Sequence, residues 1–511
     1  MAGTTKDILL DPITEGMISE GVLSHYVSPA GAMSYLENFH NDTLGVLTSR
    51  PPLKPSSYNP AALPGSACLY TLSTTTAYIV WTEGTTLKYA SSDNSGIVNN
   101  YTSAASGSTP SRFDTILGKL IITQGSTAQP KFTDLSGAPV SLITSFPATN
   151  SMDIISAGFV GRIWGAESLS ADARVYYSDV IPAGGLGSVT GGASYLTINA
   201  NSGDKVTALI RTQQCLFVFT NNGIFRIFNT QSQDNTPIVN VGTPRQESVV
   251  QTKDGYYFFH ATGIYKLGID GSVQEISTKI RPILARISPF AVNDVIGWAD
   301  KDHVYFSLGK DVGNLDPDGK KSWTVRYTIS TQVWTLYSFY DFLPSCVASS
   351  VLPDYVSTAQ ISPFPTTWVF GSLISNASSY SANTFDSPAY TTGSQEIGVN
   401  GDLGTYKIYC KAITNWKTFG KEPHYKRVNG FTQAHENASG FVVDYVKDKD
   451  NPSVWQNVGN LDQDQVKLFR DFQSDEFNKI KFRVQGETLG SIVTIGQMGI
   501  VGLDDLGYKN N

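Results

Sequence analysis

A strand–turn–strand segment occurs twice in this chain, and the repeat limits the folds open to it more than any other feature. The first copy, CLFVFTNNGIFRIF, begins at Cys215, and the second, GYYFFHATGIYKL, begins at Gly255. When Gly223 is aligned with Gly263, forty residues further on, the aromatic, aliphatic and basic positions coincide. Both faces of the first strand are apolar, which is typical of a strand sandwiched between two other sheets.

Seven segments of the chain share this pattern of a short apolar strand, a turn and a second strand. Their first strands are centred on Ile79, Ile121, Ile163, Phe217, Tyr257, Tyr305 and Val369, so that successive centres are 42, 42, 54, 40, 48 and 64 residues apart. A weaker apolar segment precedes each hairpin and would supply an inner strand. This order at this period predicts an irregular β-propeller of about six to seven blades. Core strands of an ordinary sandwich remain an alternative, because the repeats lack a WD or kelch signature.

The turns of the twinned hairpins are expected to be tight. Asn221, Asn222 and Gly223 tolerate a positive φ, as a tight hairpin turn requires, and Gly263 is expected to do the same in the second copy.

A change in charge content divides the chain near residue 395. Residues 1–400 carry 23 basic and 30 acidic side chains, whereas residues 401–511 carry 14 of each, and longer alternating strands begin at Tyr406. We expect an extended segment at 1–60, a propeller at 61–395 and an antiparallel β-sandwich at 396–511 that serves assembly. A strand at 44–49 would close the propeller or dock elsewhere. No long helix is expected.

The overall charge and the cysteines exclude several classes of protein. The net charge of −7 gives no basic field for holding a polyanion. The four cysteines (Cys68, Cys215, Cys346 and Cys410) show no CxxC spacing and are expected to be free thiols. The sequence starts without an apolar signal region, and no apolar run approaches the roughly 18 residues of a membrane helix, so no membrane-spanning segment is expected.

Motifs for catalysis are missing from the sequence. The six histidines have no metal-binding spacing, and neither GxSxG nor a Walker motif occurs. The stretch from Asn314 to Gly319 resembles half of a calcium loop, but Val325 stands where a bidentate Glu is needed. Six tryptophans would either form a carbohydrate platform or fill the space between blades: Trp81, Trp164, Trp298, Trp323, Trp334 and Trp368. We expect neither enzymatic activity nor a cofactor.

Three stretches together resemble a known family. In LENFHNDTLGVLTSRPPLK the matching positions are Asn38, Leu47, Arg50 and Pro51. In the twinned hairpins and the segment after them, the matching positions are Gly223, Gly263, Ile264, Tyr265, Ser277 and Ile280. In WKTFGKEPHYKRVNGFTQA they are Gly420 and Pro423. With these residues the chain resembles the tail nozzle proteins of short-tailed phages, also called tail tubular protein B or packaged-DNA stabilisation proteins. Pro52 departs from the family, which usually has Gly there.

The resemblance implies a structural virion protein of the phage tail, assembled in the host cytoplasm. Its subunits would form a ring, commonly a homohexamer, that meets portal, adaptor and tail-fibre proteins. The ring would extend the DNA channel and help to retain and release the genome, and double-stranded DNA would pass through it without specific binding.

Two other functions and one channel hypothesis remain open at this point. The chain would alternatively be a carbohydrate-binding or depolymerising propeller for host attachment, or a monomeric adhesion module. Glycines between the third and fourth repeats would form a loop that narrows the channel, unless this loop is an insertion without a role: Gly184, Gly185, Gly187, Gly191 and Gly192.

Overall fold

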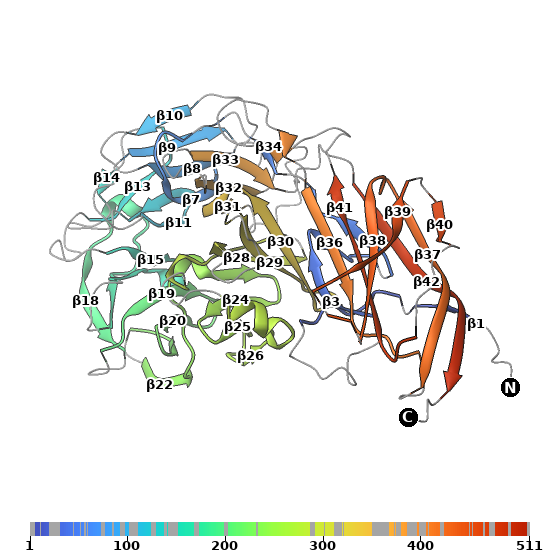
Figure 1. The fold of residues 1–511 in the computed structure, drawn as a ribbon. Helices are drawn as coiled ribbons and strands as arrows, with labels where there is room; N and C mark the ends of the chain where they lie inside the picture. The colour runs from blue at the N-terminus through green and yellow to red at the C-terminus, as the bar shows by residue number, and fades with distance from the viewer. Residues whose placement is uncertain are drawn as a thin grey trace.

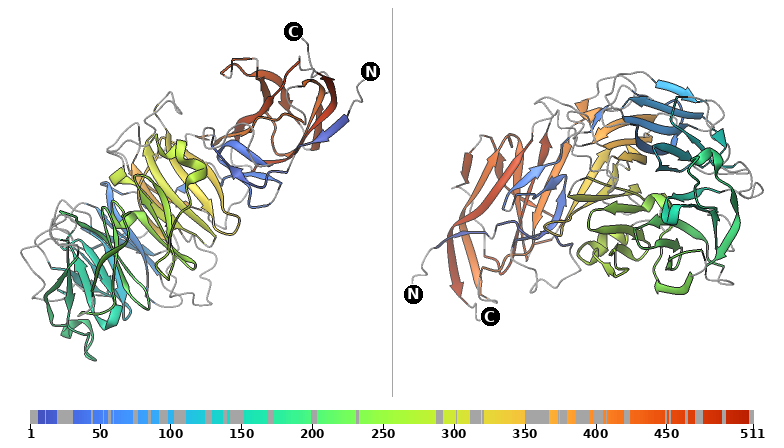
Figure 2. Two further views of the ribbon diagram at one scale, coloured as in Figure 1. Left: turned by 90° about the horizontal axis from the view of Figure 1, so that it is seen from below. Right: turned by 180° about the vertical axis from the view of Figure 1, so that it is seen from behind.

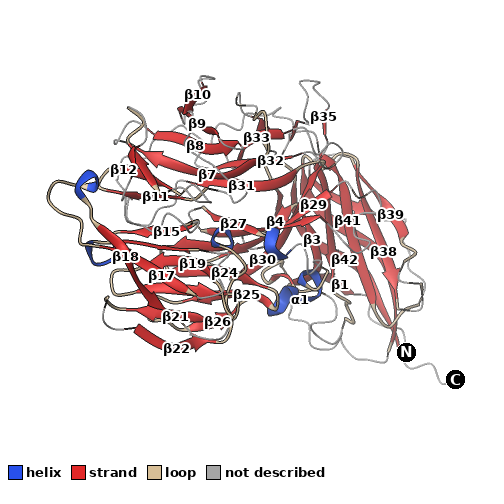
Figure 3. Ribbon diagram, turned by 90° about the vertical axis from the view of Figure 1, so that its left-hand side faces the viewer, coloured by secondary structure: helices blue, strands red, loops and turns tan. Residues whose placement is uncertain are grey.

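The computed structural model is almost entirely β-structure (Figures 1 and 3). It describes residues 6–507 with gaps, of which those of four residues or more are 20–30, 73–76, 92–97, 102–110, 124–128, 142–151, 168–172, 199–202, 287–291, 311–318, 350–366, 375–379, 386–395, 398–404, 420–423 and 470–475. In the described part, α1 (Arg281–Leu284) is the one α-helix. Short 3-10 turns are η1 (Phe159–Gly161), η2 (Leu186–Ser188), η3 (Gln246–Ser248), η4 (Thr278–Ile280) and η5 (Val292–Asp294). Among the described residues, no helix is long and apolar enough to span a bilayer.

Four-stranded antiparallel sheets follow one another along the first three quarters of the chain. Blade one is β7 (Pro64–Thr71), β8 (Ala77–Glu83), β9 (Thr86–Ser91) and β10 (Val98–Tyr101). Blade two is β11 (Phe113–Ile116), β12 (Lys119–Ile122), β13 (Lys131–Thr133) and β14 (Val140–Ser141). Blade three is β15 (Ile154–Ala157), β16 (Ile163–Ala166), β17 (Arg174–Ser178) and β18 (Gly191–Thr197). Blade four is β19 (Val206–Arg211), β20 (Leu216–Thr220), β21 (Ile224–Ile227) and β22 (Gln233–Val239).

Three further blades complete the ring. Blade five is β23 (Val249–Thr252), β24 (Gly255–His260), β25 (Gly263–Leu267) and β26 (Val273–Glu275). Blade six is β27 (Ile296–Ala299), β28 (His303–Lys310), β29 (Lys321–Thr328) and β30 (Val333–Tyr340). Blade seven is β31 (Leu343–Ser349), β32 (Thr367–Ser372), β33 (Tyr380–Phe385) and β6 (Lys54–Pro55). The inner strand of blade seven contacts that of blade one, so the described sheets form an irregular seven-bladed propeller.

The sequence period located the blades correctly. All seven predicted strand centres lie in the second strand of a blade, and the weaker apolar segments before them are the inner strands. The twinned hairpins form adjacent blades, where Phe219 of β20 packs edge-on against Phe258 of β24 at 5.3 Å between ring centroids. Their apolar faces are buried because each blade is covered by its neighbours.

The expectation of a positive φ at the twinned turns was wrong. Gly223 and Gly263 both have negative φ, as do Asn221 and Asn222. Glycine fits there because another part of the chain approaches closely. A Cβ atom on Gly263 would lie 2.6 Å from Ser277 Oγ, and one on Gly223 would lie 3.3 Å from a carbon of Pro237.

The propeller is closed by a strand that precedes its first blade. β6 pairs with β33, and Tyr58 is buried between Trp81 of blade one and Trp368 of blade seven. The strand considered for this role at 44–49 lies elsewhere. It is β5 (Leu47–Ser49), which pairs with β42 (Thr494–Gly507) in the other domain.

The other domain is a sandwich of two sheets, with both chain ends at its outer side (Figure 1). One sheet orders β4 (Phe39–His40), β5, β42, β37 (Tyr425–Glu436) and β40 (Gln465–Phe469), with β1 (Lys6–Leu9) beside β42. The other orders β3 (Ala32–Glu37), β36 (Ile408–Thr414), β41 (Ile480–Thr488), β38 (Phe441–Lys447) and β39 (Gln456–Leu461), with β2 (Gly16–Met17) beside β3. A two-stranded sheet of β34 (Glu396–Ile397) and β35 (Thr405–Tyr406) stands apart.

The sandwich therefore contains strands from both ends of the sequence. Its core joins Leu47 and Phe39 to residues more than 380 positions later, among them Phe431 and Phe482, whose rings stack at 4.7 Å. The two domains lie end to end, as the left view of Figure 2 shows. They are connected by one sheet, because β3 pairs with β36 of the sandwich and, in parallel, with β30 of blade six.

Candidate functional site

Charged side chains meet across the propeller axis. Arg112 precedes the inner strand of blade two, Asp153 precedes that of blade three, and Glu247 lies in η3 before that of blade five. The Arg112 guanidinium donates from Nε to Glu247 Oε1 at 2.8 Å and from Nη1 to Asp153 Oδ2 at 3.0 Å. Arg245 Nε donates to the other oxygen of Glu247 at 2.8 Å. Because blades two and five are not neighbours in a ring of seven, this contact must cross the centre.

The Glu247 carboxylate at the axis is held in its charged form. Burial alone would raise the pKa of Glu247, but Arg112 and Arg245 outweigh it and hold the pKa well below its usual range. Burial would likewise lower the pKa of Arg112, and Glu247 and Asp153 raise it instead. A carboxylate neutralised by two guanidinium groups is a poor general acid or base near neutral pH. The arrangement is thus suited to closing the axis, and less to acid–base chemistry.

A second set of charges lies further along the same inner strands. The backbone N–H of Ala157, at the end of β15, donates to Asp114 Oδ2 of β11 at 2.7 Å. Arg211, at the end of β19, donates to the Ala157 carbonyl and lies 3.8 Å from Asp114 Oδ1. Burial raises the pKa of Asp114, and Arg211 opposes this in part. These contacts connect blades two, three and four.

The joint between propeller and sandwich contains a buried polar network. Asn38 has a positive φ of 57° at the end of β3, and its Oδ1 accepts from Arg50 Nε and from Ser338 N, both at 2.8 Å. Its Nδ2 donates to Ser338 Oγ of blade six and to the Tyr409 carbonyl of the sandwich, both at 2.8 Å. Asn38 thereby binds both domains at once. The positive φ is a conformation that Asn tolerates better than most residues.

Arg50 completes this network from the other side. It is 2% exposed, donates from Nη2 to the Ser338 carbonyl at 2.8 Å and from Nη1 to the Pro51 carbonyl at 3.0 Å, and lies over the Phe339 ring at 4.8 Å. Glu37 supplies a negative charge nearby, since its Oε1 accepts from Ser338 Oγ and from Lys321 Nζ, both at 2.8 Å. The joint is therefore a largely buried, charge-balanced contact of the kind that fixes two bodies in one geometry.

A second ion cluster holds the turn that follows β4 against blade six. Arg326 Nη2 donates to both oxygens of Asp42, at 2.9 and 2.7 Å. His303 Nδ1 lies 2.7 Å from Asp300 Oδ1, and its Nε2 lies 3.6 Å from Asp42 Oδ1. Burial lowers the pKa of His303, but the hydrogen bonds to Asp300 and Asp42 outweigh it and raise the pKa to about 9. Burial lowers the pKa of the neighbouring His40 to about 3. At neutral pH His303 is thus a cation and His40 is neutral.

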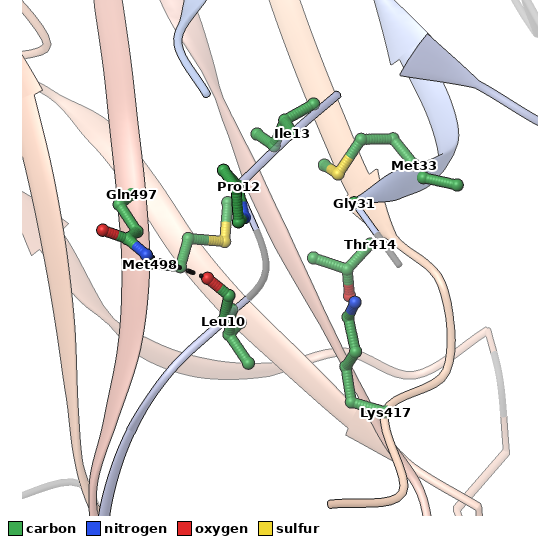
Figure 4. Close-up of a pocket in the computed structure, with 10 residues that line it drawn as sticks. Leu10, Pro12, Ile13, Gly31, Met33, Thr414, Lys417, Gln497 and Met498 are labelled. Atoms are coloured by element: carbon green, nitrogen blue, oxygen red, sulfur yellow. Dashed lines mark hydrogen bonds between the residues drawn. The ribbon is translucent and has the colours of Figure 1, made fainter. Parts of the chain in front are cut away.

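A small pocket lies inside the sandwich, under the segment that follows β1 (Figure 4). Its volume open to the centres of water molecules is about 20 Å³, enough for one water. The walls are mainly apolar, with Leu10, Ile13, Met33 and Met498, while Gln497 Nε2 donates to the Leu10 carbonyl at 3.1 Å. A pocket of this size does not accommodate a cofactor.

The residues named from the family resemblance fall into separate places. Asn38 and Arg50 meet in the joint, Pro51 gives its carbonyl to Arg50, and Leu47 is buried in the sandwich core. Gly420 and Pro423 lie outside the described residues.

The motif residues of blade five form one local arrangement. Ser277 Oγ accepts from the backbone N–H of Ile264 at 2.9 Å, and it lies directly beside Gly263. Ile280 is buried in the large core that also contains the sandwich residues. Tyr265 stacks on Phe258 at 5.5 Å between ring centroids, and its hydroxyl lies 2.8 Å from Thr262 Oγ1.

The glycine loop lies between the two outer strands of blade three, at the end of the propeller away from the sandwich (Figure 1). Leu186 and Val189 anchor it in the apolar cluster between blades two and three. Gly191 has a φ of 77°, and a Cβ there would lie 2.8 Å from Asp179 N. The loop is therefore a packed turn, and it is remote from the axis of its own propeller.

Sequence reasoning missed the axis charges and the Asp42 cluster. A signal for the first exists, because Arg112, Asp153 and Glu247 all occupy the few positions directly before an inner strand. The six tryptophans that were weighed as a carbohydrate platform are all buried, at 4% exposure or less. Among the described residues, no group of three His, Cys, Asp or Glu side chains could hold a metal ion. The calcium-like stretch at Asn314 lies outside them except for Gly319.

The fold and these sites define the chain as a seven-bladed β-propeller joined to a β-sandwich. No protein-family model matches it, and no curated protein does. Among solved structures it is similar to a gluconolactonase from Xanthomonas campestris, at 12% identity over 75% of this chain and 98% of that one, with a TM-score of 0.34. It is also similar to the extracellular domain of a hybrid two-component system from B. thetaiotaomicron, at 11% identity over 89% of this chain and 63% of that one, with a TM-score of 0.46. These likenesses are too distant to carry an argument about function.

Proposed function

We propose that this chain is a structural subunit of a short phage tail, a nozzle protein whose copies form a ring around the DNA channel. The observation that supports the proposal most is the joint. Asn38 and Arg50, which belong to the motif that resembles the nozzle family, are the residues that lock the propeller to the sandwich. A subunit that must keep its shape in a ring needs such a rigid connection.

The closed propeller axis also supports a structural role. Arg112 and its two carboxylate partners occupy the centre of the blade ring, so DNA would pass between subunits and not through a propeller. The net charge of −7 agrees with a surface that lets DNA slide without gripping its phosphates. The proposed hexameric copy number and the portal, adaptor and tail-fibre partners come from the family resemblance.

The test is assembly of the purified full chain, alone and with portal and adaptor proteins. Light scattering should report a closed oligomer, and electron microscopy should show a ring with a central channel. Arg281→Met is a suitable control variant because Arg281 is an exposed side chain on α1, and it should assemble normally. A strict monomer that never joins portal or adaptor would overturn the proposal, and so would turnover on a polysaccharide panel.

The glycine loop is proposed to face the channel formed between subunits. Its place at the far end of blade three leaves it free to contact another copy or passing DNA. Gly185 has a φ of 79° and open space around its Cβ position, so Gly185→Asp would add a charge with some backbone strain. If genome retention and ejection are unchanged by this variant and by Gly187→Asp, the loop has no channel role.

A further inference from the structure

The strand β1 is a short edge strand of the sandwich. It has four residues, pairs on one side only with β42, and its register shifts between Lys6 and Ile8. Leu9 is 68% exposed, the most exposed large apolar side chain among the described residues. An edge strand that exposes an apolar side chain is a place where another chain can pair or pack.

The segment after β1 rests on an incompletely filled surface. Leu10 and Ile13 point toward the pocket lined by Met33 and Met498 (Figure 4). Methionine adapts its shape to different neighbours, and a void under a segment lowers the cost of lifting it. Pro12, between Leu10 and Ile13, cannot donate a backbone hydrogen bond.

β1 is held to its own copy by pairing with β42 at Lys6, Ile8 and Leu9, and Gln497 Nε2 donates to the Leu10 carbonyl at 3.1 Å. Leu10 N donates to the Met498 carbonyl at 2.9 Å, and Gly502 N donates to Asp7 Oδ1 at 2.9 Å. Beyond Pro12 the attachment is firmer, because Gly45 N donates to the Ile13 carbonyl at 3.0 Å and Thr14 N to the Gly31 carbonyl at 3.2 Å. The hinge for any movement of β1 therefore lies near Pro12.

We propose that β1 exchanges between copies of this chain, pairing with β42 of the neighbouring subunit. A second copy is the occupant because its β1 has, by identity, the register and apolar side chains that fit this edge. From Pro12 to Lys6 the extended segment reaches about 20 Å, so the neighbour's β42 must lie within that distance. Exchange in one direction around the ring would tie each subunit to the next. The inference deepens, and rests on, the proposed ring assembly.

The experiment uses two single-cysteine variants that can be linked only between copies. Ile8 and Ile500 are directly opposed in the register, so Ile8→Cys and Ile500→Cys chains are purified separately, mixed, assembled and oxidised. Exchange should give a disulfide-linked dimer on a non-reducing gel. A matched control is the mixture of Val443→Cys and Val484→Cys, opposed and buried in β38 and β41, which should give none.

Each outcome of the cross-linking experiment distinguishes strand exchange from ring assembly. If either core variant misfolds, Lys6→Cys mixed with Leu503→Cys repeats the test at the next pair of the register. Oligomers by light scattering with no linked dimer would overturn the exchange and leave the ring standing. Linked dimers without a ring would support the exchange and count against the nozzle assignment. A chain that stays monomeric and unlinked would overturn both.

Discussion

Replacing Arg50 by Met should loosen the joint and destabilise the whole molecule. The change removes three hydrogen bonds from a guanidinium that is 2% exposed, to Asn38 Oδ1 and to the carbonyls of Pro51 and Ser338. It leaves Glu37 and Lys321 of the network in place.

The expected loss in the free energy of unfolding follows from the number of these hydrogen bonds. Each hydrogen bond from a charged donor contributes roughly 1.5–3 kcal/mol, so that three amount to about 4.5–9 kcal/mol. Removing the charge also removes its desolvation penalty of several kcal/mol. The net decrease in the free energy of unfolding is then about 3–5 kcal/mol, as is typical when one partner of a buried polar network is removed. Arg50→Lys should recover little of it, because an ammonium group does not reproduce the planar fork.

Urea unfolding followed by the fluorescence of the eight tryptophans measures this loss. Arg281→Met is the control, since Arg281 is exposed and its removal should change little. Limited proteolysis should also become faster in the strands of the joint. If Arg50→Met unfolds at the same urea concentration as the control, the joint does not hold the domains together and the reasoning fails.

Three other changes have defined outcomes. The pKa of His303 in the folded protein, about 9, lies above its unfolded value, so protonated His303 stabilises the fold fully below about pH 6.5 and loses this effect as the pH rises through 9. In urea titrations, the difference in unfolding free energy between wild type and His303→Gln should therefore be smaller at pH 9.5 than at pH 6. A Cβ on Gly263 would lie 2.6 Å from Ser277 Oγ, so Gly263→Ala should lower the free energy of unfolding by about 1–3 kcal/mol, whereas Gly187→Ala, with its nearest neighbour at 3.9 Å, should not. Arg112→Met should lower the melting temperature clearly because it removes the guanidinium that joins Glu247 to the buried carboxylate of Asp153. Equal melting temperatures would mean that the axis contacts contribute nothing.

The periodic parts of the fold were predictable from the sequence because they follow from local chemistry. Ile79, Phe217 and Tyr305 each lie in an apolar run bounded by turn residues, and each is in the second strand of its blade. The turn at Gly263 was assigned to a glycine correctly but for the wrong reason, since the crowding comes from Ser277, which directly precedes η4. Local patterns show where a strand ends and do not show which strand lies beside it.

The candidate site was less predictable because its contacts are long-range. Arg112 and Glu247 are 135 residues apart, and Asn38 and Ser338 are 300 apart. The family resemblance pointed to Asn38 and Arg50 without indicating that they meet. No periodicity reports a contact between two different domains, so the joint and the axis became visible only in three dimensions.

The arrangement of the sandwich has a consequence for how the chain is made. β3 lies between β30 and β36, and β5 pairs with β42, so the pairing of β5 with β42 waits until nearly the whole chain has been synthesised. At roughly 5–20 residues per second, that wait is on the order of 20–90 s. During this time β3 and β5 expose apolar side chains that end in the core. We therefore expect a nascent chain cut short near its end to aggregate.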